Sequence, residues 1–200
     1  MRLVVGLGNP GERYERTRHN VGFRTIDAVM AASGAEPERV GKSLVARAYG
    51  GLLVKPQTRM NLSGEALLEL RTLHAFEASE VLIVVDDINL PLGTLRLRVG
   101  GSTGGHNGLR NVEWALGTIE YPRLRIGVGE APDDAQVDLR EFVLAPFAAA
   151  EEPRVEEAVG RAKGLVTGFL HGDALTRLAA CYNGGPDRES GDGASRSRKE

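Results

Sequence analysis

His19 stands in a polar loop and has the side chain best suited to act as a base at neutral pH. An imidazole with its ordinary pKa of about 6.5 is neutral often enough to take a proton from water. A carboxylate facing the other ring nitrogen would fix the tautomer and stabilise the imidazolium that forms. Asp86 follows five consecutive apolar residues and could supply that carboxylate. The pair could therefore activate water for attack on a carbonyl carbon, although a histidine in a polar loop is more often a simple surface residue.

Three asparagines could hold the carbonyl under attack. Asn9 follows the first strand-like run, and Asn61 and Asn107 stand where helices are expected to begin. Side-chain amides and helix N-terminal N–H groups can bind a developing oxyanion. Asparagine is also common in turns and at helix caps, so each residue alone is weak evidence. Their number makes a hydrolytic cleft plausible.

Other hydrolytic chemistries lack their parts in this sequence. There is no G-x-S-x-G motif for a serine nucleophile and no H-E-x-x-H motif or Cys/His cluster for zinc. Cys181 is the only cysteine, so an internal disulfide cannot form, and it has no evident catalytic neighbour. We therefore expect an activity without metal or cofactor.

Gly6–Gly11 (GLGNPG) matches the G-x-G-x-x-G pattern of dinucleotide-binding proteins. That site needs a helix that starts within the glycine loop and holds the pyrophosphate at its N-terminus. Pro10 disfavours helical geometry at Asn9, and residues 12–20 have no apolar helical face. The sequence therefore favours a tight turn that presents Asn9 over a dinucleotide-dependent enzyme.

Strand-like and helical segments alternate along the chain. The predicted strands are residues 2–6, 43–49, 52–55, 81–85, 94–99 and 123–129. The predicted helices are residues 21–32, 63–76, 108–116 and 151–182, the last with a break near Gly172. This order indicates a single α/β domain over residues 1–183. Residues 184–200 are almost devoid of apolar side chains and are predicted to be a disordered tail.

The predicted strands explain how distant residues could meet. In an open α/β sheet, ligands bind beyond the carboxyl ends of the parallel strands. The strand at 2–6 leads to Asn9, Tyr14 and His19, and the strand at 81–85 leads to Asp86. We therefore expect these side chains to share one cleft.

The bulk composition places the chain among ordinary globular proteins. The sequence is 42% hydrophobic and 26% charged, with a net charge of −2. It has no apolar run long enough to span a membrane and no signal-peptide pattern, which favours the cytoplasm. Basic residues exceed acidic ones in residues 1–130, and the reverse holds in residues 131–183. A phosphate-rich partner is expected to meet the N-terminal two thirds.

Six motifs, taken together, resemble the bacterial peptidyl-tRNA hydrolase family in order and spacing. They are Val5–Gly11 (VGLGNPG), Thr17–Gly22 (TRHNVG), Met60–Gly64 (MNLSG), Asp86–Gly93 (DDINLPLG), Gly104–Leu109 (GGHNGL) and Arg123–Gly129 (RLRIGVG). The resemblance covers residues 2 to about 183. It implies a three-layer α/β/α fold with a twisted, mixed, mostly parallel sheet. It also implies a usually monomeric enzyme that hydrolyses the ester between a peptide and the 3′-terminal ribose of tRNA without metal or cofactor.

The resemblance also implies a role for each matching residue. His19 is expected to activate water with support from Asp86, and Asn9 to distinguish an N-blocked peptidyl group from a free aminoacyl group. Asn61 and Asn107 are expected to position substrate and water, and Tyr14 and Met60 to line the site of the peptide and the tRNA 3′ end.

Two departures from the family pattern concern the tRNA contacts. Arg59 stands where the family usually has an aromatic residue, and Asp133-Asp134 stand where it tends to have a basic one. Arg98 agrees with the family, and we expect Arg98 and Arg125 to contact phosphates. A non-catalytic RNA-binding protein on the same fold remains the alternative, because such proteins can keep the active-site residues.

Overall fold

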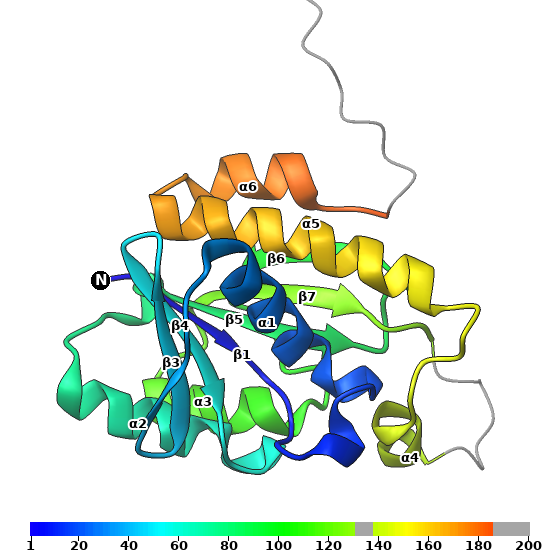
Figure 1. The fold of residues 1–200 in the computed structure, drawn as a ribbon, viewed down its shortest axis with the longest axis horizontal. Coiled ribbons are helices and arrows are strands. Elements are labelled where there is room, and N and C mark those ends of the chain that lie inside the picture. Colours follow the sequence, from blue (N-terminus) through cyan, green and yellow to red (C-terminus); the bar gives the residue numbers. More distant parts are fainter. Residues whose placement is uncertain (131–137, 186–200) are drawn as a thin grey trace, which may run out of the picture.

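Seven strands form one mixed sheet in the computed structural model, which describes residues 1–130 and 138–185 (Figure 1). The strand order is β2-β3-β4-β1-β5-β7-β6. The four central strands, β4 (Gly51–Pro56), β1 (Leu3–Gly6), β5 (Val81–Asp87) and β7 (Pro122–Gly127), are parallel to one another. β2 (Glu38–Val40) and β3 (Ser43–Ala48) at one edge, and β6 (Leu95–Val99) at the other, run antiparallel.

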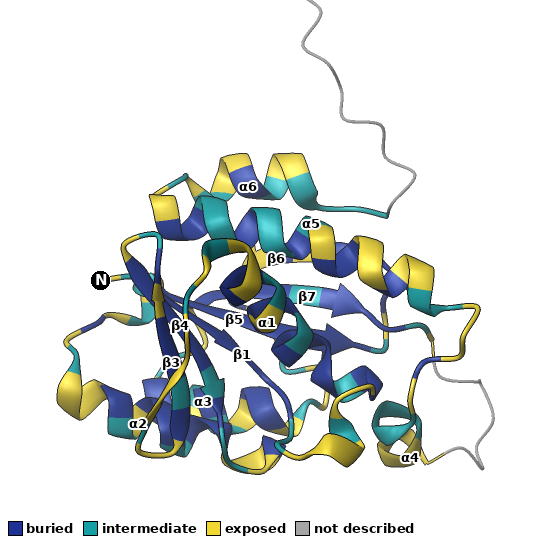
Figure 2. Ribbon diagram, in the orientation of Figure 1, coloured by how far each residue is buried: buried dark blue, intermediate teal, exposed yellow. Residues whose placement is uncertain are grey.

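Helices cover both faces of the sheet and complete three layers (Figure 1). α1 (Val21–Ser33) and α5 (Glu152–His171) pack on the face that carries Val4 and Val84. α2 (Ser63–Leu73) and α3 (Asn107–Leu116) pack on the opposite face, which carries Val5 and Val85. α6 (Leu175–Tyr182) lies against α5 and β6. Figure 2 shows the buried central strands between partly exposed helices, so the core is a double layer around β1 and β5. The predicted α/β class is confirmed.

Several boundaries differ from the predictions. The helix predicted over residues 63–76 ends at Leu73, because His74 adopts an extended conformation. β2 and the short helix α4 (Leu139–Leu144) were not predicted: both are too short for a clear periodic pattern, and β2 is largely exposed. Gly172 ends α5 in a left-handed conformation, as the predicted break near this residue requires.

The glycines of the first motif allow close packing between α1 and β1. A Cβ atom on Gly6 would lie 2.4 Å from the carbonyl oxygen of Gly22, and one on Gly22 would lie 2.4 Å from that of Leu7. A Cβ on Gly8 would collide with the Phe23 ring. α1 begins at Val21, well beyond the glycine motif. The motif therefore brings the start of α1 against the sheet, which is a different use from the nucleotide-binding turn.

The end of the described chain adds to the edge of the sheet. The backbone N–H of Gly184 donates to Leu95 O at 2.8 Å, and Leu95 N–H donates to Gly184 O at 3.0 Å. These two hydrogen bonds form an isolated bridge between Gly184 and β6. Residues 186–200, most of the predicted tail, and the Asp133-Asp134 pair lie outside the described residues. Within the described part of the chain, no helix is long and apolar enough to cross a bilayer.

Candidate active site

A cleft of about 1010 Å³ opens at the carboxyl ends of β1 and β5. The hydrogen bond from Leu7 N–H to Val84 O aligns these two strand ends, so the loops that follow them lie side by side. Eight of the nine predicted site residues line this cleft: Asn9, Tyr14, His19, Met60, Asn61, Asp86, Asn107 and Arg125. The exception is Arg98. The expectation that the other residues share a cleft is therefore met.

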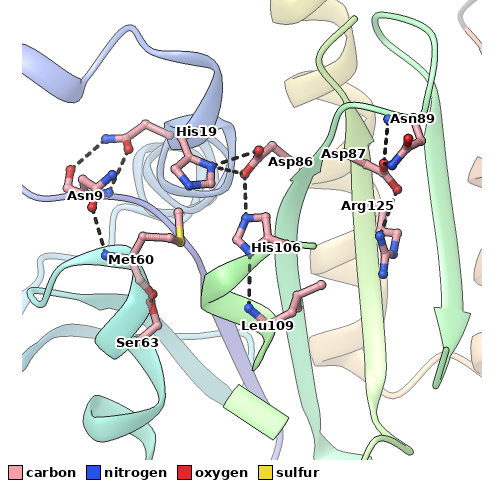
Figure 3. Close-up of polar contacts among 11 residues, drawn as sticks. Asn9, His19, Met60, Ser63, Asp86, Asp87, Asn89, His106, Leu109 and Arg125 are labelled. Atoms are coloured by element: carbon pink, nitrogen blue, oxygen red, sulfur yellow. Dashed lines mark hydrogen bonds and ion pairs between the residues drawn. The ribbon is translucent and has the colours of Figure 1, made fainter. Parts of the chain in front are cut away.

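His19 and Asp86 form a hydrogen-bonded pair from two different parts of the fold (Figure 3). His19 lies in the 3-10 turn Arg18–Asn20 directly before α1, and Asp86 is the second-to-last residue of β5. The Nδ1 atom of His19 is 2.9 and 3.0 Å from the two carboxylate oxygens of Asp86. Nδ1–H must donate to the carboxylate, which leaves the lone pair of the neutral ring on Nε2. The His19 side chain keeps 14% of its surface exposed, so this nitrogen can meet water in the cleft.

His106 also contacts Asp86, a role that the sequence analysis missed. Its Nε2 lies 3.1 Å from Asp86 Oδ1, and its Nδ1 accepts a hydrogen bond from Leu109 N–H at 3.2 Å. An Nδ1 that accepts carries no proton, so the ring is neutral and its Nε2–H donates to Asp86. The only sequence signal was its place before Asn107 at the start of a predicted helix.

The environment of the pair sets its protonation. Burial alone would lower the pKa of His19, but the charge and hydrogen bond of Asp86 outweigh burial and raise it above 6.5. Burial opposes the charge of Asp86, yet the adjacent His19 and His106 hold the pKa of this carboxyl well below its usual range. Asp86 is therefore ionised, and His19 is a stronger base than a free imidazole.

The Asn9 loop is fixed by two amide contacts. Asn9 N–H donates to Asn20 Oδ1 at 2.8 Å, and Asn20 Nδ2 donates to Asn9 O at 2.9 Å. Asn9 Oδ1 accepts from Met60 N–H at 2.9 Å. Because this oxygen is occupied, the Nδ2 group of Asn9 is oriented as a donor, and it has no acceptor among the described residues. Asn20, buried and adjacent to His19, is a positioning residue that the sequence analysis did not identify.

Asp87 turns to a different partner from Asp86. Its Oδ2 lies 3.0 Å from Arg125 Nη1, and its Oδ1 accepts from Asn89 N–H at 2.9 Å. Arg125 also donates to the carbonyl oxygen of Ser102. Arg125 thus lines the cleft, and protein groups hold its guanidinium on one side.

Arg98 lies outside the cleft, on the exposed edge strand β6. It stands opposite Arg123 in the antiparallel pair β6–β7, and Arg96 stands opposite Arg125. Directly opposed residues point to the same face of a sheet, where like charges repel. Arg123 is buried and bonded to Gly101 O, Ile119 O and Glu113, whereas Arg96 and Arg98 are exposed. The two exposed arginines make this edge of the sheet suited to a polyanion.

α4 forms a wall of the cleft that the sequence analysis did not anticipate. Leu139, Arg140, Val143 and Leu144 line the cleft from this helix. Arg18 anchors the segment: its guanidinium lies 4.6 Å from the Phe142 ring centroid and 4.8 Å from that of Phe147. It also pairs with Glu151 at 2.8 Å. The neighbour of His19 in sequence therefore ties this wall to the base.

The catalytic cluster also has the composition of a metal site. Ligand atoms of His19, Asp86 and His106 all lie within 4.8 Å of one another. Each of these atoms already has a hydrogen-bond partner within the cluster. These hydrogen bonds hold the three side chains in an arrangement that can transfer a proton.

The fold and this site define an α/β protein that can activate water with a His–Asp pair at the carboxyl edge of its sheet. The chain belongs to the peptidyl-tRNA hydrolase family, whose model matches residues 3–189. A peptidyl-tRNA hydrolase from Chloroflexus aurantiacus is 43% identical over 189 residues, which is 92% of this chain and 99% of that protein. One from Thermus thermophilus is 42% identical over 184 residues, covering 92% and 97% of the two chains. The crystal structure of the Acinetobacter baumannii enzyme superimposes with a TM-score of 0.81 at 29% identity, covering 92% of this chain and 96% of that one.

Proposed function

We propose that this protein hydrolyses the ester between a peptide and the 3′-terminal ribose of tRNA. The observation that carries the proposal is the His19–Asp86 pair, which opens on a cleft lined by Asn9, Asn61 and Asn107. Membership of the peptidyl-tRNA hydrolase family supports this choice of ester. The reaction would return tRNA from prematurely released peptidyl-tRNA to translation.

The first step is attack by water. His19 Nε2 takes one proton from a water molecule as the oxygen bonds to the ester carbonyl carbon, and the carbonyl electrons move to its oxygen. Asp86 stabilises the imidazolium that forms and keeps its Nδ1 proton in place. The side-chain amides of Asn61 and Asn107 are available in the cleft to position the water and the oxyanion.

The second step breaks the ester. The tetrahedral intermediate collapses, the bond to the ribose oxygen breaks, and the His19 imidazolium returns its proton to that oxygen. The products are a peptide with a free carboxylic acid, which releases its proton to solvent at neutral pH, and a tRNA with a free 3′-terminal ribose. No covalent bond forms between the protein and the peptide, and the reaction uses neither metal nor cofactor.

Asn9 is suited to select N-blocked substrates. Its Oδ1 is bound to Met60 N–H, so its Nδ2 is directed away from that contact as a donor. A peptidyl group offers a second carbonyl oxygen beyond the aminoacyl residue, and a free aminoacyl group offers a charged ammonium instead. A fixed donor favours the carbonyl and disfavours the ammonium.

Arginines in and beside the cleft supply the phosphate contacts. Arg13, Arg59, Arg125 and Arg140 line the cleft, and Arg96 and Arg98 extend the basic surface along β6. Arg13 stacks on the ring of Tyr14 at 4.5 Å from its centroid, so these two side chains form one wall for the substrate. Affinity for tRNA is therefore expected to fall as salt is raised. We also propose that the protein acts in the cytoplasm as a monomer.

The experiment is release of peptide from N-acetylaminoacyl-tRNA. The wild type is expected to be active, and His19→Ala to lose about 10²–10⁴-fold in kcat. His74→Ala removes a histidine outside the cleft and serves as the matched control. A wild type that binds tRNA but releases no peptide would instead support the alternative, a non-catalytic RNA-binding protein. Equal turnover of free aminoacyl-tRNA would contradict the role of Asn9.

A further inference from the structure

Trp114 is the only tryptophan of the chain and lies on the outer surface of α3 with 64% of its surface exposed. Neither the core nor the proposed chemistry uses it. An exposed indole contributes little of the free energy that a tryptophan normally gains when its large apolar surface is buried. Its position therefore suggests a contact made with a partner.

α3 connects Trp114 to the active site. Asn107, which lines the cleft, is the first residue of the helix, and Arg110 and Trp114 follow at spacings of three and four. Side chains at these spacings lie on one face of a helix. Arg110 Nη1 lies 3.4 Å from Asn107 Oδ1, which confirms the shared face. At about 1.5 Å per residue, Trp114 stands roughly 10 Å along the helix from Asn107.

The charges around Trp114 favour an anion. Arg110 is exposed one turn before it, and Arg71 of α2 reaches the carbonyl oxygen of the next residue, Ala115, at 3.5 Å. Glu113 is the only acidic residue of α3, and it pairs with the buried Arg123 at 3.3 Å. The surface formed by Arg71, Arg110 and Trp114, here called the α3 ridge, thus combines an exposed aromatic ring with an arginine one turn before it and a second arginine bonded to the backbone of the next residue.

We propose that the α3 ridge binds the unpaired 3′ end of the tRNA, with a base stacked on Trp114 and a phosphate at Arg110. The inference rests on the proposed function, which puts the terminal ribose beside Asn107. The preceding nucleotides must leave the cleft along its wall, and the α3 ridge begins at that wall. Aromatic rings stack on unpaired bases with little regard to sequence, and arginines neutralise the backbone between them.

The composition of the α3 ridge argues for RNA over a protein partner. A large apolar docking site would present a contiguous apolar patch on this face of α3. On α3, the residues that precede Trp114 on its exposed face are Arg110 and Asn107, both polar. Arg110 and Trp114 together supply the two groups that a stacked base and its phosphate need, an aromatic ring and a guanidinium.

Fluorescence gives a direct test, because the single tryptophan is the only indole that can report. We expect tRNA with its unpaired 3′ end to quench the emission of Trp114, and tRNA trimmed of those nucleotides to leave it unchanged at equal concentration. Free N-acetyltryptophanamide corrects for absorption by the RNA. Equal quenching by both RNAs, or none by either, would overturn the proposal.

Kinetics give a second test. Trp114→Ala should raise KM for N-acetylaminoacyl-tRNA about tenfold with little change in kcat, and Trp114→Phe should recover most of that loss. Leu73→Ala, which truncates another exposed apolar residue, should change neither constant. Arg110→Ala should raise KM more than Arg154→Ala, an exposed arginine on α5 at the opposite face. An unchanged KM in Trp114→Ala, or a change in its self-association, would count against the RNA contact.

The two tests separate this inference from the proposed function. Quenching is measured with uncharged tRNA, so it does not depend on hydrolysis. An inactive wild type whose Trp114 is quenched by intact but not by trimmed tRNA would refute the hydrolase and keep the α3 ridge. An active wild type without quenching would refute the α3 ridge and keep the hydrolase.

Discussion

Asp86 and Asp87 are adjacent, buried carboxylates at the end of the same strand, yet their surroundings differ completely (Figure 3). Asp86 contacts two imidazole rings. Its carboxylate lies within hydrogen-bond distance of Nδ1 of His19 and Nε2 of His106. Asp87 contacts Arg125, whose charge is permanent, and the backbone of its own turn at Asn89. One carboxylate is therefore bonded to imidazole rings, and its neighbour is bonded to a permanently charged guanidinium and a backbone amide.

The difference teaches that burial and charge alone do not identify a catalytic carboxylate. Successive side chains of a strand point in opposite directions, so two adjacent residues reach different elements. Asp86 meets the turn before α1, and Asp87 meets β7. The chemistry of each aspartate is set by the residue that the fold brings to it.

The largest expected effect separates the two aspartates directly. Asp86→Asn should lower kcat on N-acetylaminoacyl-tRNA by about 10²–10⁴-fold, because an amide can hold His19 in the wrong tautomer and cannot stabilise the imidazolium. Asp87→Asn is the matched control and should lower kcat less than about tenfold. Single-turnover rates of both variants check this, and equal losses would contradict separate roles.

Removing the ion-pair partner of Asp87 should mainly lower the stability of the protein. Arg125→Ala leaves a buried carboxylate without its ion pair, and we expect it to lower the free energy of unfolding by about 2 kcal/mol, less than for a fully buried pair. Arg98→Ala removes an exposed arginine and should change the free energy of unfolding by less than about 0.5 kcal/mol. Urea unfolding followed by circular dichroism measures both free energies. Equal losses in the two variants would contradict a stabilising role for the Arg125–Asp87 ion pair.

His106→Ala should have an intermediate effect on the Asp86 side. It removes one hydrogen bond to an ionised carboxylate, so kcat should fall about tenfold while KM stays nearly constant. His171→Ala removes a histidine that packs on Tyr49, far from Asp86 in the fold, and is the control. A change confined to KM would mean that His106 contacts substrate and does not position Asp86.

The smallest effect concerns the titration of His19. Asp86 raises its pKa, so the acid limb of kcat/KM should have its midpoint above 6.5, with activity lost as pH falls and Nε2 becomes protonated. In Asp86→Asn only the effect of burial remains, and the pKa of His19 should move below 6.5. Asp87→Asn should leave it in place. Proton NMR of the histidine ring measures the pKa in all three proteins, and an unmoved resonance in Asp86→Asn would contradict the electrostatic coupling.

The sequence predicted the elements with strong periodicity and the residues at their ends. The apolar run before Asp86 and the polar loop around His19 were enough to expect a common cleft, because parallel strands deliver their loops to one edge. The particular ester came from the resemblance to a family, since spacing alone stopped at a hydrolytic site. The order of the motifs also carried the assignment of Asn61 and Asn107 to the cleft.

The sequence could not predict contacts between distant parts of the fold when the residues involved have no periodic pattern that indicates a partner. His106 and Asn20 are single polar residues whose partners lie far along the chain or across a loop. α4 is six residues long, and its anchor, Arg18, is charged although it is nearly buried between two phenylalanine rings. Arg98 was selected from the family pattern and grouped with Arg125 as a phosphate contact, but only the structure shows that Arg98 is exposed on β6 outside the cleft while Arg125 lines it.

The contact between Gly6 and Gly22 constrains how this sequence can diverge. The close approach of α1 to β1 and β5 sets the separation between the turn that carries His19 and the strand that leads to Asp86, because a Cβ on Gly22 would lie 2.4 Å from Leu7 O and 2.6 Å from Val84 O. Drift among the core side chains can be absorbed by repacking without moving these two residues apart. A single added methyl group at either glycine cannot be absorbed in this way. Over evolutionary time, the lineage is therefore free to replace much of its interior but must retain two residues that have no side chain at all.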